Sequence, residues 1–109
     1  MAYDEALAER VRDVLAVREA ISERKMFSGI AFMIAGNMGC AVTSRGLMVR
    51  LDPDDAERAM AEPHVGPMEM SGKPARGWIL VAPEGLDDDG ALAGWVDAGA
   101  DFATSLPPK

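Results

Sequence analysis

The sequence predicts a single α+β domain in which helices pack on an antiparallel sheet. Three observations lead to this fold class. The 109 residues suffice for one hydrophobic core, apolar residues recur at helical spacing near both ends of the chain, and they alternate with a period of two in between. The predicted order is α-β-β-β-α-β-β-α, which makes one two-layer domain over residues 1–109.

The first helix is predicted to begin at Asp4 and to end within residues 17–20. One helical face is apolar and consists of Leu7, Val11, Val14 and Leu15. Glu9 and Arg12, three residues apart, are placed to form an ion pair on the helix surface. The polar residues 22–24 that follow are predicted to form a link rather than a regular element.

Three strands are predicted between residues 30 and 51, because apolar residues alternate there. The sets expected to share a face are, strand by strand, Ile30, Phe32 and Ile34; Met38, Cys40 and Val42; and Leu47, Val49 and Leu51. Each of the turns at 35–37 and 44–46 contains a glycine, which accepts the positive φ of a tight turn. Connections this short predict an antiparallel meander.

The second helix has the clearest start signal in the chain. Asp52 is suited to accept the free amide protons of a first turn, and Pro53 suits the first helical position. The helix is expected to stop before Pro63, because the residue that precedes a proline is steered away from helical geometry.

Two further strands and a last helix complete the prediction. Residues 68–70 and 78–81 have strand character, and the acidic residues 87–89 are expected to open the helix. Its buried stripe is predicted to contain Leu92, Trp95, Val96, Gly99, Phe102 and Ala103. Gly94 and Gly99 are expected to weaken this helix by up to about 1 kcal/mol each relative to alanine.

Composition argues against several classes of protein. The formal net charge of −7 opposes sequence-independent binding to nucleic acid. No run reaches the roughly 20 apolar residues that a membrane helix needs, so no membrane partner is expected. The single cysteine, Cys40, excludes an intramolecular disulfide, and no signal peptide is visible. Both features suit the cytoplasm.

No catalytic, cofactor-binding or metal-binding constellation is predicted, and an enzyme is not expected. Cys40 lies in an apolar strand, where burial is the usual state of a free cysteine. His64 lies between prolines in a loop and is expected to be solvated. The acidic runs 52–55 and 87–89 lack the ligand spacing of a calcium loop, so helix N-termini explain them better.

Met33 and Met48 lie on the strand faces opposite the main apolar sets. A sheet covered on one side only is usually polar on the other, so these methionines indicate a second covering layer. We expect that layer to be another copy of the chain; the alternative is that adaptable methionines fill an irregular core. Five basic residues near the sheet are expected to form a solvated rim: Lys25, Arg45, Arg50, Lys73 and Arg76.

Four short segments resemble the N-terminal domain of the TfoX/Sxy family. They are Lys25-Met26-Phe27-Ser28-Gly29, Asn37-Met38, Gly77-Trp78 and the tail Ser105-Leu106-Pro107-Pro108-Lys109. Ser28 stands where the family has a glycine. The resemblance implies the same element order, a fold similar to secretion-chaperone-like domains, and frequent dimerisation. The best-known members of the family are bacterial regulators of competence-gene expression.

The resemblance implies a non-enzymatic regulatory and protein-interaction domain that acts in the cytoplasm as a homodimer. The motif residues are implied to be structural rather than catalytic: Lys25, Met26, Phe27, Gly29, Gly77 and Trp78. Two alternatives stay open. One is direct nucleic-acid binding by the basic residues, and the other is a small-ligand-binding protein or enzyme with a pocket near Phe27, His64 and Trp78.

Overall fold

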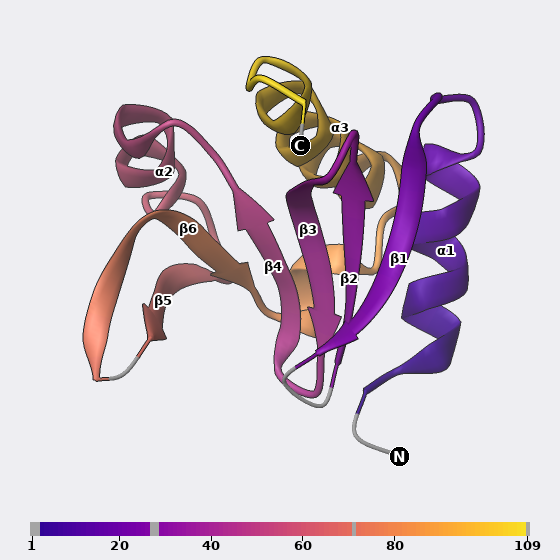
Figure 1. The fold of residues 1–109 in the computed structure, drawn as a ribbon. Coiled ribbons are helices and arrows are strands. Elements are labelled where there is room, and N and C mark those ends of the chain that lie inside the picture. The colour runs from indigo at the N-terminus through magenta and orange to yellow at the C-terminus, as the bar shows by residue number, and fades with distance from the viewer. Residues whose placement is uncertain (1–2, 27–28, 71, 109) are drawn as a thin grey trace.

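The computed structural model describes residues 3–26, 29–70 and 72–108, which form a six-stranded antiparallel sheet with helices packed on it (Figure 1). In chain order the elements are α1 Glu5–Leu15, β1 Ile21–Met26, β2 Gly29–Ile34, β3 Asn37–Thr43, β4 Gly46–Arg50, α2 Pro53–Ala59, β5 Val65–Met70, β6 Lys73–Val81, the 3-10 helix η1 Pro83–Leu86 and α3 Asp89–Thr104. The strand order across the sheet is β1-β2-β3-β4-β6-β5. The predicted α+β class is confirmed.

The main difference from the prediction is a fourth strand before α2. Residues 22–24, predicted to be a link, lie inside β1, which pairs with β2 from Ile21 opposite Ile34 to Met26 opposite Gly29. β1 is an edge strand, and its residues 22–25 are exposed. Polar and charged residues are therefore compatible with a strand at this position.

The helices begin where the sequence predicts. Asp4, Asp52 and Asp88 cap α1, α2 and α3, and each carboxylate accepts a hydrogen bond from an amide of the first turn. The acidic runs therefore serve as helix N-termini. At its other end α1 stops at Leu15, before the predicted range, and Val17 is 90% exposed.

The main core lies between the sheet and the helices that cover one of its faces (Figure 1). As the alternation predicts, it contains Ile30, Phe32, Ile34, Cys40, Val42, Leu47 and Val49 from the strands and Leu51, the residue after β4. Helix α3 comes closest to the sheet at β3, where a Cβ atom on Gly99 would lie 2.4 Å from the carbonyl oxygen of Gly39. This approach excludes any side chain at Gly99 without movement of the backbone.

Met38 lies on the sheet face opposite to Cys40, so the prediction that they share a face is wrong. Phe32 pairs with Cys40, whereas Met33 pairs with Met38, and Gly39 is left as an extra residue in β3. Such a bulge inverts the alternation of side chains on the residues beyond it. The strand pattern is therefore correct only from Cys40 onward.

Candidate functional site

The sheet face that the helices leave uncovered carries a second apolar cluster, termed the outer cluster. Ala31, Ala41 and Met48 are buried in it, and Met33, Met38, Met68, Trp78 and Leu80 pack around them half-buried. All eight residues belong to strands, while α1 and α3 pack on the other face, and α3 lies behind β2 and β3 in Figure 1.

Cross-strand pairing explains why the outer cluster is continuous. Ala31 pairs with Ala41, Ala41 with Met48, and Met48 with Leu80, so one row of apolar side chains crosses β2, β3, β4 and β6. On β1 the row is continued by Arg24, opposite Ala31. The row therefore has an apolar middle and a charged end.

The predicted residues and the observed ones overlap only in part. Met33 and Met48 both lie in the outer cluster. Met68, Trp78 and Leu80 were not anticipated for this face, although Trp78 and Leu80 are two residues apart and thus share a strand face. From that spacing, the sequence alone could have predicted that these two β6 residues lie on one face of the sheet.

Arg50 lies at the border of the outer cluster and contacts both Trp78 in this cluster and Phe102 in helix α3. Its guanidinium carbon lies 5.6 Å from the ring centre of Trp78 and 5.5 Å from that of Phe102. Cation–π contacts of this kind contribute roughly 0.5–1 kcal/mol each where water is near. Arg50 thus joins a residue of the uncovered face to a residue of the helical layer, and it is half-buried rather than part of a fully solvated rim.

The five basic residues do not form one continuous strip. Lys25 lies on the edge strand β1, whereas Lys73 and Arg76 lie on β6. Strands β2, β3 and β4 lie between them, which amounts to four strand spacings or roughly 19 Å. The sheet order therefore separates the cations on which the nucleic-acid alternative depends.

Cys40 is buried as predicted, with 1% of its surface exposed. Burial raises the pKa of its thiol to about 12, because the desolvated thiolate is disfavoured. His64 lies in an exposed loop before β5. Within residues 3–26, 29–70 and 72–108, no three His, Cys, Asp or Glu side chains gather as a metal site would require. In the same ranges, no helix has the length and apolarity to cross a bilayer.

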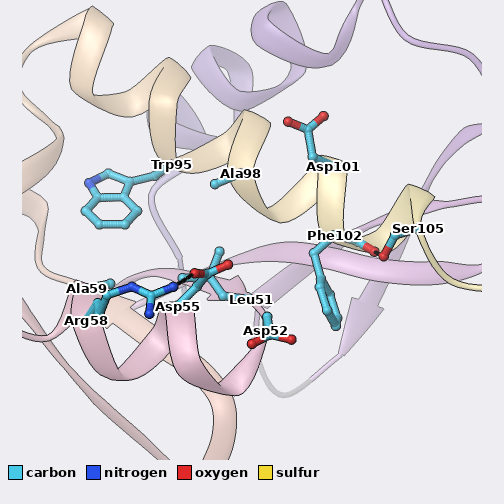
Figure 2. A pocket seen from close by; sticks show the side chains of 10 residues that line it. All are labelled: Leu51, Asp52, Asp55, Arg58, Ala59, Trp95, Ala98, Asp101, Phe102 and Ser105. Atoms are coloured by element: carbon cyan, nitrogen blue, oxygen red, sulfur yellow. Dashed lines mark hydrogen bonds and ion pairs between the residues drawn. The ribbon is translucent and has the colours of Figure 1, made fainter.

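Helix α2 borders two of the hollows that the described residues form. The larger, of about 580 Å³, lies between α2 and α3 and is walled by Trp95 and Phe102 (Figure 2). A smaller one of about 270 Å³ lies between α2 and β6 and includes Trp78. Of the pocket expected near Phe27, His64 and Trp78, only Trp78 lines this hollow, while Phe27 lies outside the described residues.

Comparison with protein families matches residues 13–103 to the TfoX N-terminal domain. The chain belongs to this family. The matched range starts within α1, ends within α3 and includes all six strands. Comparisons of the chain with curated proteins and with solved structures find no match.

In this TfoX N-terminal domain, the first family motif spans the connection from β1 to β2. Lys25 is exposed and Met26 is the last residue of β1. Gly29 opens β2, and a Cβ atom there would lie 2.3 Å from a backbone carbonyl oxygen of β3. The close approach of β3 requires a glycine at this position. Phe27 and Ser28 of the motif lie outside the described residues.

The other family segments make backbone contacts between distant parts of the chain. Gly77 has a φ of 82°, and its carbonyl oxygen accepts a hydrogen bond from the amide of Leu51 at 2.7 Å. The next residue, Trp78, belongs to the outer cluster. Asn37 is buried, and its side-chain nitrogen donates to the carbonyl oxygen of Pro107 at 2.9 Å. Two family segments, the Asn-Met pair and the tail, therefore contact each other.

Proposed function

We propose that this TfoX N-terminal domain is a non-enzymatic protein-interaction domain in transcription regulation, and that two copies associate through their outer clusters. Membership of the family supports the regulatory role, because its best-known members regulate competence genes. Because bacterial regulators of transcription act in the cytoplasm, we expect the protein to be located there. The homodimer is the part of the proposal that rests on the geometry of the sheet.

The observation that carries the proposal is the uncovered apolar face. Contiguous apolar patches with polar borders mark interaction sites on soluble proteins. Four of the eight outer-cluster residues are methionines, whose flexible thioether side chains adapt well to a facing surface. Arg24 lies opposite Ala31 at the β1 end and provides a polar border.

The outer cluster covers five of the six strands, because β1 contributes the charged Arg24 to this face. Five strands at about 4.8 Å spacing and about six residues at 3.3 Å per residue give an apolar face of roughly 20 by 20 Å. This is about half of the 800 Å² that each partner buries in a standard interface, so the polar border would contribute the rest. A twofold axis would bring the same patch of both copies together, which is the commonest arrangement of homodimers.

The test is the effect of a charge placed at Met33 on association. Met33 is half-buried, so Met33→Glu is compatible with the fold, but in the dimer it would bring two carboxylates into an apolar interface. We expect the natural chain to sediment as a dimer at micromolar concentration and Met33→Glu to dissociate at least about a hundredfold more readily. Sedimentation equilibrium measures both constants.

Val17→Glu is the matched control, because it introduces the same charge at a residue that is 90% exposed and lies outside both clusters. It should leave the dissociation constant unchanged. Circular dichroism checks that both variants are folded. A natural chain that stays monomeric at high micromolar concentration, or a Met33→Glu variant that dimerises as tightly as Val17→Glu, would refute the proposed interface.

A further inference from the structure

The cleft between α2 and α3 is a second candidate site, on residues separate from the outer cluster. We propose that it binds an amphipathic helical segment of a partner protein that places a bulky apolar side chain next to a lysine or arginine. The apolar side chain would enter between Trp95 and Phe102, and the cation would lie at the Asp52 end. Dimerisation through the sheet is not needed for this site.

The walls of the cleft come from one face of α3. Trp95 and Phe102 are seven residues apart, which places them on the same helical face about 10.5 Å apart along the axis. Both side chains extend toward α2 in Figure 2, and Ala98 lies between them. Two aromatic walls with a small residue between them form a slot for one large apolar side chain.

The slot stays open because small residues line both of its sides. Ala98 on α3 and Ala59 on α2 both border it, and Leu51, the residue after β4, adds a third apolar contact. The volume of about 580 Å³ lies within the 300–1,000 Å³ that is usual for binding sites. A larger side chain at Ala98 would occupy this space.

Acidic side chains outnumber basic ones in the lining of the cleft, which contains three aspartates and Arg58, while Arg50 lies next to the lining with its guanidinium carbon 5.5 Å from the ring centre of Phe102. Asp55 pairs with Arg58, and Asp101 pairs with Arg18 at 2.8 Å and points away from the cleft in Figure 2. Asp52 has no ion pair within the described part of the chain. Its Oδ1 caps α2 by accepting the amide of Asp54 at 3.0 Å, which leaves Oδ2 for an incoming cation.

A helical segment fits this arrangement better than an extended peptide. The apolar contacts of the cleft follow the side of α3 at helical spacing, and an amphipathic helix presents anchors at i, i+3 or i+4, and i+7 to such a groove. The cleft is bordered by helices and not by a free strand edge. A lysine or arginine next to the anchor would contact the Asp52 carboxylate, which lies at the Phe102 end of the cleft in Figure 2.

The probe is a synthetic amphipathic helix about four turns long, with leucines on one face and lysines beside them. A second peptide carries glutamates in place of the lysines. Binding is followed by fluorescence anisotropy of the labelled peptides. In a Trp78→Phe background, Trp95 is the remaining tryptophan, so a shift of its emission reports contact at the cleft. We expect the lysine peptide to bind at least about tenfold more tightly than the glutamate peptide.

Two pairs of variants localise the binding. Ala98→Gln fills the slot and should weaken the lysine peptide at least about tenfold, whereas Ala6→Gln, the same change on the exposed surface of α1, should have no effect. Asp52→Asn keeps a good N-cap residue but removes the charge. It should therefore reduce the preference for lysine over glutamate without loss of folded protein, and Asp54→Asn is its neighbouring control.

Met33→Glu separates this proposal from the dimer. It should leave peptide binding intact, because it lies in the outer cluster and not in the cleft. Loss of peptide binding in Met33→Glu with retention in Ala98→Gln would assign the peptide to the sheet face and overturn the proposal. Equal affinity for both peptides, or no binding at high micromolar concentration, would overturn it as well.

Discussion

Phe32 and Met33 are neighbours in β2 and lie on opposite faces of one sheet. Phe32 is completely buried in the core beneath the helices, whereas Met33 is half-buried in a cluster that only strands build. Both faces are apolar, but only one is covered from within the chain. The strands thus present more apolar surface than the helices of this domain cover, and the surplus is available to another molecule.

The largest predicted effect is the contrast between alanine substitutions at these two neighbours. Phe32→Ala should lower the free energy of unfolding by about 3–5 kcal/mol, since it leaves a cavity among rigid neighbours. Met33→Ala should lower it by about 1 kcal/mol or less, because solvent and flexible methionines fill the space. Urea denaturation at low protein concentration, where association contributes little, measures both.

If Phe32→Ala and Met33→Ala lowered the free energy of unfolding equally, this would contradict the distinction between a covered and an uncovered face. The concentration dependence of Met33→Ala gives a further check. If the outer cluster joins two copies, the natural chain should gain stability with rising concentration more steeply than Met33→Ala does.

The second contrast lies within α3 and separates its sheet-facing side from its exposed side. Gly99→Ala should destabilise by about 1–3 kcal/mol, because the new methyl group would overlap the backbone of Gly39. Gly94→Ala should stabilise by about 0.5–1 kcal/mol, since Gly94 is exposed and, apart from its chain neighbours and the adjacent backbone of α3, no atom lies within 4 Å of the added carbon. Thermal unfolding distinguishes the two signs, and a stabilising Gly99→Ala would show that α3 and β3 are not in close contact.

The smallest effect concerns the two sides of the edge strand β1. Arg12 on α1 holds Glu23 by two hydrogen bonds of 2.7 and 2.9 Å, which keep the pKa of the Glu23 carboxyl below its ordinary value of 4.5. A carboxyl with a lowered folded-state pKa stabilises the fold above its unfolded pKa, and the contribution disappears as pH falls through the folded one. Glu23→Gln should therefore cost about 1 kcal/mol or less at pH 7, after solvent screening, and nothing at strongly acidic pH.

Arg24→Gln is the control for that pH dependence, because Arg24 faces the outer side of β1 and forms no ion pair within the described ranges. As the pH falls from 7 to 2, the free energy of unfolding of Glu23→Gln should approach that of the natural chain. Any difference between Arg24→Gln and the natural chain should stay the same over this range. A constant cost of Glu23→Gln across that range would show that packing, and not charge, holds β1 to α1.

Local signals in the sequence were sufficient for the starts of the helices and for most faces of the strands. Asp52 followed by Pro53 predicts the start of α2 correctly, because the residues that satisfy free amide groups lie next to them in sequence. Alternation placed Met33 and Met48 opposite the main core, because successive side chains of any strand point to opposite faces. Neither inference depends on distant parts of the chain.

Only the tertiary structure decided the features that depend on distant partners. The polar residues of β1 become a strand because β2 offers a free edge and Arg12 offers a partner for Glu23. The bulge at Gly39 moves Met38 to the outer cluster, and the approach of Gly99 from α3 occurs at the same glycine. The α2–α3 cleft also has no local signature, because the two helices that border it are far apart in sequence. By itself the sequence determined the helix starts and the apolar character of both sheet faces; packing decided which face the helices cover and where they leave a cleft.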